Sequence, residues 1–168
     1  TMQQNILKNL NNIKYNILKI CKKINRNPKD INIVAVSKKQ PLEKIAKLLK
    51  YDHYCFGENR LEELEEKWTG LDKSKLKLHF IGALQSKKVK DIVKQFNVIE
   101  TLDTESSAIK IANLNINYQS RPKLFVQINL GNEKQKRGIA SYEAENFFKM
   151  CKEKYKLTIS GAMAIPPK

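Results

Sequence analysis

The sequence predicts an α/β protein in which parallel strands are covered by helices on their outer side. Short apolar segments rich in β-branched residues alternate with amphipathic helical segments along most of the 168 residues. The segment between successive strands is long enough for the helical crossover that parallel strands require. Each predicted strand is also followed by small or polar residues. Parallel α/β folds place their active-site residues at the carboxyl ends of the strands, which is where these residues lie. Since loops are polar in most proteins, this last pattern has an ordinary structural explanation as well.

The first element is an amphipathic helix over residues 3–25. Its apolar residues recur alternately every four and three positions, with lysine and asparagine between them: Ile6, Leu10, Ile13, Ile17, Ile20 and Ile24. The same stripe would suit a coiled coil or a membrane surface, but in a chain of this kind it predicts a helix that covers part of the core. The segment Asn25-Arg26-Asn27-Pro28 ends this helix.

Strands and helices then alternate to the end of the chain. The predicted strands are residues 31–36, 53–56, 77–81, 98–102, 123–130 and 157–160. The predicted helices between them are residues 41–50, 61–68, 86–96, 105–116 and 142–155. Pro41 opens the second helix, because the fixed φ of proline suits the first helical turn. The run 123–130 is the longest and most apolar strand candidate.

Composition excludes several classes of protein. The net charge of +15 comes from 28 lysines and only four arginines, and the lysines are spread along the whole chain. Arginine is the residue favoured for bidentate recognition of bases and phosphates, so we expect weak nonspecific binding to nucleic acid and no dedicated site. No apolar run is long enough to span a membrane. The three cysteines are far apart and form no Cys-x-x-Cys pair, which predicts reduced thiols in a cytoplasmic protein.

Lys38 is the most informative candidate for chemistry. It lies in the polar turn Ser37-Lys38-Lys39-Gln40-Pro41, which directly follows the apolar run 31–36. Partial desolvation at such a boundary would disfavour the ammonium form and favour a neutral amine, which forms a Schiff base with an aldehyde. The alternative is that Lys38 and Lys39 are two more solvated charges.

Other reaction schemes find no support in the sequence. It contains no phosphate-binding loop, dinucleotide fingerprint, nucleophile elbow or histidine pair at metal-ligand spacing. Glu58, Glu62 and Glu63 follow a predicted strand, where a general base would suit, but acidic residues are also favoured in the first turn of a helix. His79 lies in an apolar run, which is more typical of a hydrogen-bonded core histidine than of a catalyst.

Several short motifs, taken together and in order, are more specific than any one of them. They are Ala35-Val36-Ser37-Lys38, Phe56-Gly57-Glu58-Asn59, His79-Phe80-Ile81-Gly82, Leu84-Gln85-Ser86, Val126-Gln127-Ile128-Asn129, Glu133-Lys134, Gly138-Ile139 and Met163-Ala164-Ile165-Pro166. Across essentially the whole chain, this series resembles the YggS/PROSC family of pyridoxal-phosphate-binding proteins.

The resemblance implies a (β/α)8 TIM barrel like the N-terminal domain of alanine racemase. This chain would be an incomplete version, with about six βα units and an N-terminal helix, and residues 1–168 would form a single domain. The cofactor would be pyridoxal 5′-phosphate (PLP), held as a Schiff base on Lys38. The segments that match the family's pocket give further cofactor-binding candidates: Asn59, His79, Gln85 and Met163. The family serves vitamin B6 homeostasis without an established turnover reaction, so we expect no catalytic residues and no metal site.

The chain also departs from the family pattern. Leu78, Arg60, Glu62 and Lys87 replace residues common in the family at the rim of the site. The larger departure is that the sequence stops at Lys168, about two βα units before the family pattern ends. In the family, those two units supply the phosphate-binding segments. Because the phosphate-binding segments are missing, we expect weak phosphate affinity. Six parallel strands cannot close a barrel, so we also expect self-association through the open seam. The basic segments 86–88 and 134–137 would offer substitute anion contacts or would simply be solvated.

Three functions stay open at this point. The first is a PLP-binding homeostasis protein, and the second is a PLP-dependent racemase-like enzyme. Racemases of this fold take a tyrosine from a further β-domain, which this chain does not have. The third is a truncated barrel without cofactor that acts as a basic binding module. The expected partners are therefore PLP and a second copy of the chain, with no specific nucleic acid and no membrane.

Overall fold

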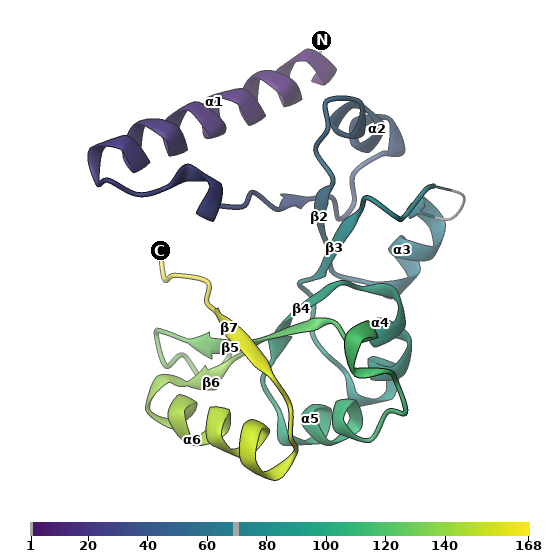
Figure 1. Cartoon of the computed structure of the whole chain (residues 1–168), viewed down its shortest axis with the longest axis vertical. Helices are drawn as coiled ribbons and strands as arrows, with labels where there is room; N and C mark the ends of the chain where they lie inside the picture. Colours follow the sequence, from purple (N-terminus) through teal and green to yellow (C-terminus); the bar gives the residue numbers. More distant parts are fainter. Residues whose placement is uncertain (1, 69–70) are drawn as a thin grey trace.

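The computed structural model describes residues 2–68 and 71–168 and contains one parallel sheet (Figure 1). Its strands follow one another in chain order: β1 (Ala35–Val36), β2 (Cys55–Glu58), β3 (Lys77–Phe80), β4 (Val98–Leu102), β5 (Lys123–Asn129) and β7 (Ile159–Met163). A short strand, β6 (Ile139–Ala140), pairs with the end of β5. All pairings are parallel, which confirms the predicted α/β class.

Five helices lie along the outer side of the sheet, and a sixth precedes it (Figure 1). The helices are α1 (Met2–Lys23), α2 (Leu42–Lys50), α3 (Leu61–Trp68), α4 (Val89–Gln95), α5 (Glu105–Ala112) and α6 (Ala144–Lys149). The predicted helix 86–96 begins with a 3-10 turn, and the predicted helix 142–155 is divided into a 3-10 turn, α6 and a π-helical segment at Met150–Lys154. Helix α5 ends four residues earlier than predicted, at Ala112.

The first strand is shorter than predicted, because its neighbour begins late. Ala35 pairs with Phe56, so the start of β2 at Cys55 lies opposite Val34. The preceding residues 31–33 have no neighbouring strand to pair with, and only Ala35–Val36 form a ladder.

The core lies between the sheet and the outer helices. Alternate strand residues point into it, and helix residues meet them from outside: Phe56, Leu78, Phe80, Ile99 and Val126 from the strands, and Leu64, Trp68, Ile92 and Ile111 from the helices. The opposite face of the sheet, here called the inner face, is concave, and α2 to α6 do not cover it (Figure 1). The strand register places Val36, Gly57 and His79 side by side on this inner face.

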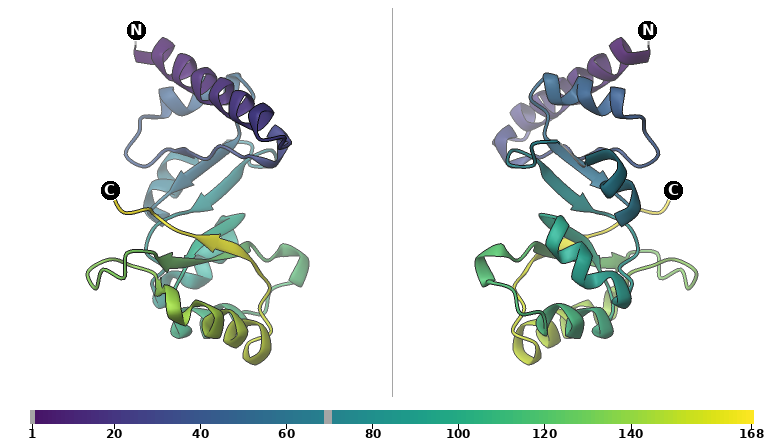
Figure 2. Two further views of the ribbon diagram at one scale, coloured as in Figure 1. Left: turned by 90° about the vertical axis from the view of Figure 1, so that its left-hand side faces the viewer. Right: turned by 90° about the vertical axis from the view of Figure 1, so that its right-hand side faces the viewer.

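Helix α1 covers less of the core than its apolar stripe predicts. Leu10 and Cys21 are buried, but Ile13, Ile20 and Ile24 are about half exposed, at 48%, 57% and 58%. The helix packs against α2 and the 3-10 turn Pro28–Asp30, and it lies at one end of the molecule away from β4–β7 (Figure 2). Because α1 contacts so few elements, one part of its stripe remains without a partner among the described residues.

The sheet does not close into a barrel. In the described part of the chain, β1 pairs only with β2, and β7 pairs only with β5. This matches the expectation of an incomplete barrel. No helix among the described residues is both long and apolar enough to cross a membrane.

Gly82 allows the segment after β3 to pass close to the segment after β2. A Cβ atom at this position would lie 2.1 Å from the backbone oxygen of Asn59, far inside van der Waals contact. At Gly161 in β7, by contrast, the nearest atoms to an added Cβ would be ring carbons of Phe125 at 3.7 Å, an ordinary contact. The two glycines therefore differ in how much space surrounds them.

Gly82→Ala is expected to lower the free energy of unfolding by about 3 kcal/mol or more, because backbone atoms must move apart to relieve the overlap. Gly161→Ala is the matched control and should change it by less than about 1 kcal/mol. Urea denaturation followed by circular dichroism measures both values. Equal midpoints for the two variants would contradict this account of the close approach.

Candidate functional site

The five predicted site residues lie at or near the carboxyl ends of the strands. Lys38 follows β1, Asn59 follows β2, and Met163 is the last residue of β7. Gln85 lies in the segment between β3 and α4, while His79 lies one residue before the end of β3. The carboxyl ends of parallel strands share one edge of the sheet, so the predicted residues lie on the side where such folds bind ligands.

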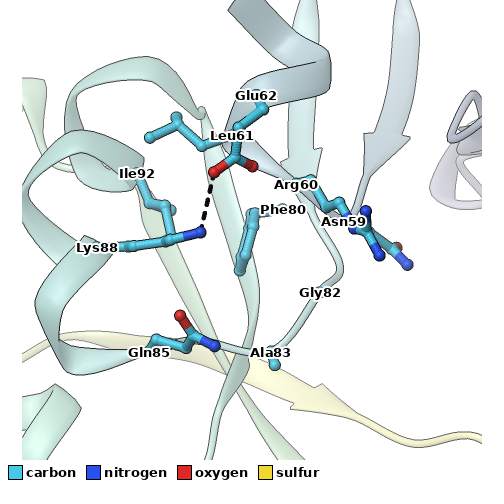
Figure 3. Close-up of a pocket in the computed structure, with 10 residues that line it drawn as sticks. All are labelled: Asn59, Arg60, Leu61, Glu62, Phe80, Gly82, Ala83, Gln85, Lys88 and Ile92. Carbon is cyan, nitrogen blue, oxygen red and sulfur yellow. Dashed lines mark hydrogen bonds and ion pairs between the residues drawn. The ribbon is translucent and has the colours of Figure 1, made fainter.

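Two of these residues line a common cavity. Asn59 and Gln85 border a cavity of about 400 Å³ between the start of α3 and the start of α4 (Figure 3). Phe80 and Ile92, which belong to the core on the helix side of the sheet, also line it, and the Glu62–Lys88 ion pair at 3.0 Å closes one side. The cavity therefore lies on the outer side of the sheet. Lys38, His79 and Met163 are not among its lining residues.

Lys38 lies in a polar turn and is exposed. The expectation that it would be partly desolvated is therefore wrong for the described residues. The physical reason is that Lys38 lies in the turn beyond β1, where little covers the chain: Val36, the last residue of β1, is itself 51% exposed on the open inner face. Lys38 is therefore accessible to a ligand in solution.

A buried polar network holds this turn in place. The Ser37 hydroxyl donates to Glu58 Oε1 at 2.8 Å, and the Ser37 amide donates to the Gly57 carbonyl at 3.0 Å. From α3, Lys67 Nζ donates to the Ser37 carbonyl at 2.6 Å and forms an ion pair with Glu58 at 3.2 Å. Ser37 is thus fixed to both β2 and α3.

The same network extends to the far side of Lys38. Glu63 accepts from Lys67 Nζ and from the backbone amide of Lys39, both at 2.8 Å. Lys39 has a positive φ of 58°, a conformation that this carboxylate contact helps to hold. Lys38 is therefore placed between two anchored residues, Ser37 and Lys39.

Glu58 is the centre of the network and is fully buried. Burial raises the pKa of its carboxyl group, although the hydrogen bond from Ser37 and the nearby Lys67 ammonium act in the opposite direction. Its second carboxylate oxygen has no hydrogen-bond partner among the described residues.

Glu62 and Glu63 lie in the first turn of α3, as predicted. Lys67 was not singled out from the sequence, although its spacing of four from Glu63 was a usable signal.

His79 lies on the inner face and is charged. Its Nδ1 atom is 2.6 Å from Glu100 Oε1 in β4. Burial opposes protonation of the ring, but hydrogen bonds with the side chains of Cys55 and Glu100 outweigh it and raise the pKa of His79 to about 9. The prediction of a hydrogen-bonded histidine is confirmed, and the ring is an imidazolium at neutral pH.

The remaining strand ends add less to the site. Met163 pairs with Gln127 of β5 and is half-buried. The basic loop 134–137 is exposed, and Lys136 forms an ion pair with Glu133 at 2.6 Å. Behind this loop, the Gly138 amide donates to Asp103 at 3.2 Å, and burial raises the pKa of that carboxyl group.

Comparison with known proteins places this arrangement in a family. Residues 8–168 match the family described as alanine racemase, N-terminal domain. The chain is 33% identical over 164 residues to the pyridoxal phosphate homeostasis protein of Haemophilus influenzae, spanning 96% of this chain and 69% of the relative. The homologue of the same name in Buchnera aphidicola is 34% identical over 165 residues, spanning 94% and 72%.

Solved structures support the same relationship. PipY of Synechococcus elongatus, solved without PLP, is 27% identical with a TM-score of 0.73, and the match covers 90% of this chain and 71% of PipY. PipY has also been solved with PLP bound. An alanine racemase of Clostridium difficile has a TM-score of 0.70 over 98% of this chain and 41% of its own, and at 20% identity it shows the fold alone.

Lys67→Met is expected to lower the free energy of unfolding by about 3 kcal/mol, because it leaves the Glu58 carboxylate buried without its counter-ion. The matched control is Lys88→Met, which removes the exposed partner of Glu62 and should cost less than about 1 kcal/mol. Chemical denaturation of both variants at neutral pH gives the two values. A similar loss in the free energy of unfolding for both variants would show that the buried Glu58 pair stabilises the protein no more than the exposed Glu62 pair does.

Glu100→Gln is expected to destabilise the protein in a pH-dependent way. The pKa of His79 is raised from 6.5 to about 9 on folding, so its contribution is fully present below pH 6.5 and is lost as the pH rises through about 9. The variant should lose roughly 1–3 kcal/mol near pH 6 and much less near pH 9.5. Urea denaturation at both pH values, with Glu62→Gln as the exposed control, measures the difference. An equal loss at both pH values would argue against a charged His79.

Proposed function

This chain belongs to the family of pyridoxal phosphate homeostasis proteins, which carry the alanine racemase N-terminal domain, and we propose on that premise that it binds PLP in vitamin B6 homeostasis. The observation that supports the proposal is the anchored turn after β1, which contains Lys38 and lies at the carboxyl edge of the sheet. PLP supplies an aldehyde to an amine when bound. A lysine on a fixed turn fits that chemistry, since little conformational freedom is lost when a ligand attaches.

The other predicted residues are proposed to surround the cofactor. Protonated His79 faces the same concave side as the strand residues next to Lys38, and its positive charge would favour an anionic ligand. Met163 borders this side from β7, on the far edge of the sheet. Asn59 and Gln85 lie at the same carboxyl edge but border the outer cavity, so we assign them a supporting part at the rim.

We further propose that the chain holds PLP without turning it over. The curated relatives are named for homeostasis, and no residue of this chain is assigned as an acid or base on a substrate. A racemase-like activity is the second candidate, and exchange of the amino-acid α-proton with solvent in the presence of PLP would detect it. Sustained exchange that depends on Lys38 would replace the carrier proposal with an enzymatic one.

The chain is also proposed to act as one domain that associates with a second copy. The edges of β1 and β7 that face away from their paired neighbours offer backbone groups for such contact, and the exposed stripe of α1 offers apolar surface. Sedimentation analysis tests this, and a monomer over a wide concentration range would refute it. The three free cysteines support a reducing, cytoplasmic location.

Covalent labelling tests the assignment of Lys38. After incubation with PLP and reduction with borohydride, peptide mass spectrometry should find the adduct at Lys38 in preference to the other 27 lysines of the 28 in the chain. Lys38→Ala should abolish the site-specific adduct. Lys39→Ala, the matched control in the same turn, should retain it. Labelling spread evenly over surface lysines, unchanged in Lys38→Ala, would end this proposal.

A further inference from the structure

A second cavity, of about 500 Å³, lies at the amino ends of β2 and β3. Four parts of the chain line it: α1, the segment 28–33 before β1, residues 52–55 at the start of β2, and the two lysines Lys75 and Lys77 at the start of β3. Its volume is within the range of cavities that bind small molecules. The cavity therefore has room for a ligand at the edge of the sheet opposite to the turn that contains Lys38.

Part of the cavity wall is apolar and accessible to solvent. The apolar side chains of this wall come from α1 and from the segment before β1: Ile17, Leu18, Pro28, Ile31 and Ile33. All five are at least partly exposed, and Leu18 is 54% exposed. A ligand with an apolar body would remove this surface from water, which is favourable.

The charged groups of the cavity are mostly ammonium groups. Lys14, Lys75 and Lys77 line it, and Asp52 is the one acidic residue among its lining residues. Within residues 2–68 and 71–168, the ion pairs that lysines form involve other lysines, so these three have no carboxylate within 4.0 Å. Lys75 Nζ lies 5.9 Å from the centre of the Tyr54 ring, a contact that leaves its charge in place.

The other ionisable groups do not cancel this positive charge. Asp52 Oδ1 already accepts a hydrogen bond from the Tyr54 hydroxyl at 2.8 Å. His53 is buried, and its Nε2 atom lies 2.7 Å from the Cys55 carbonyl oxygen. Burial lowers the pKa of His53, and the Lys14 ammonium acts in the same direction, so the ring is neutral at neutral pH. Three ammonium groups with one carboxylate favour a ligand that carries negative charge.

This cavity is distinct from the turn that contains Lys38. Cys55 lies two residues before Gly57, the partner of Val36, and Lys38 lies two residues after Val36. Four residue steps along the strands correspond to about 13 Å. A ligand in this cavity thus occupies a different position from one attached at Lys38, and its binding does not depend on PLP.

We propose that the cavity binds small organic anions that have an apolar body. The anionic group lies among the three lysines, and the apolar body lies against Leu18 and the segment before β1. Burial of the apolar body supplies most of the affinity, while the lysines select anions over uncharged molecules of the same shape.

Two fluorescent dyes that differ in one charged group test this proposal on the full chain without PLP. The first is 8-anilinonaphthalene-1-sulfonate, and the second is N-phenyl-1-naphthylamine, which lacks the sulfonate. The fluorescence of both dyes rises when their rings leave water, so a titration gives a dissociation constant for each. Both should bind saturably. Absence of saturable binding of the sulfonate dye would overturn the proposal.

Lys77→Gln tests the part played by charge. It should weaken binding of the sulfonate dye by about 3-fold, because one exposed ammonium group is removed, and should leave the uncharged dye unaffected. The matched control is Lys123→Gln, since Lys123 is the exposed first residue of β5 and its loss changes the net charge equally. Equal weakening by both substitutions, or no weakening by Lys77→Gln, would refute a local anion site.

Leu18→Gln tests the apolar wall, with Ile20→Gln as its matched control. Leu18 and Ile20 both belong to α1 and are similarly exposed, at 54% and 57%, but Leu18 lines the cavity and Ile20 does not. Leu18→Gln should weaken binding of both dyes by about 3-fold, and Ile20→Gln should change neither. Circular dichroism verifies that the variants are folded. Equal weakening by the two substitutions would place the dyes on the exposed stripe of α1 and refute the cavity as the site.

Discussion

The buried carboxylate of Glu58 is the constraint on which the candidate site depends. It joins the turn after β1, through Ser37, to α3, through Lys67. A buried charge is tolerated only when it is paired and hydrogen-bonded, so these partners cannot move independently of one another. Glu63 extends the same network to the amide of Lys39. The position of Lys38 therefore follows from an electrostatic requirement on the opposite side of the sheet.

The two faces of the sheet have different parts in the structure. The outer face is packed against the helices and contains most of the buried apolar residues together with the Glu58 network. The inner face is open, so Val36 is exposed and His79 and Cys55 are partly accessible, and Lys38 follows Val36 in an exposed turn. Stability thus comes from one face, while the groups suited to chemistry lie on the other.

The order of strands and helices was predictable because each depends on local periodicity. Strand 98–102 and helix 61–68 have the predicted bounds, and the family motifs alone indicate the fold. Contacts between strands were not predictable, since His79 meets Glu100 only through the register of β3 and β4. The exposure of Lys38 depends on what covers the concave face, and no local pattern contains that information. To predict the ion pair of Glu58 with Lys67, one would need to know both the position of Lys67 on α3 and the burial of β2.

The central claim is that the Glu58 network positions Lys38 for PLP. The most direct measurement is a spectrophotometric titration of PLP against Glu58→Gln, a variant that keeps the shape of the side chain and removes its charge, with circular dichroism to verify that the fold is retained. The variant should bind PLP at least about 5-fold more weakly than the unchanged protein, since the turn loses its ionic anchor. Unchanged affinity in a folded Glu58→Gln variant would contradict it.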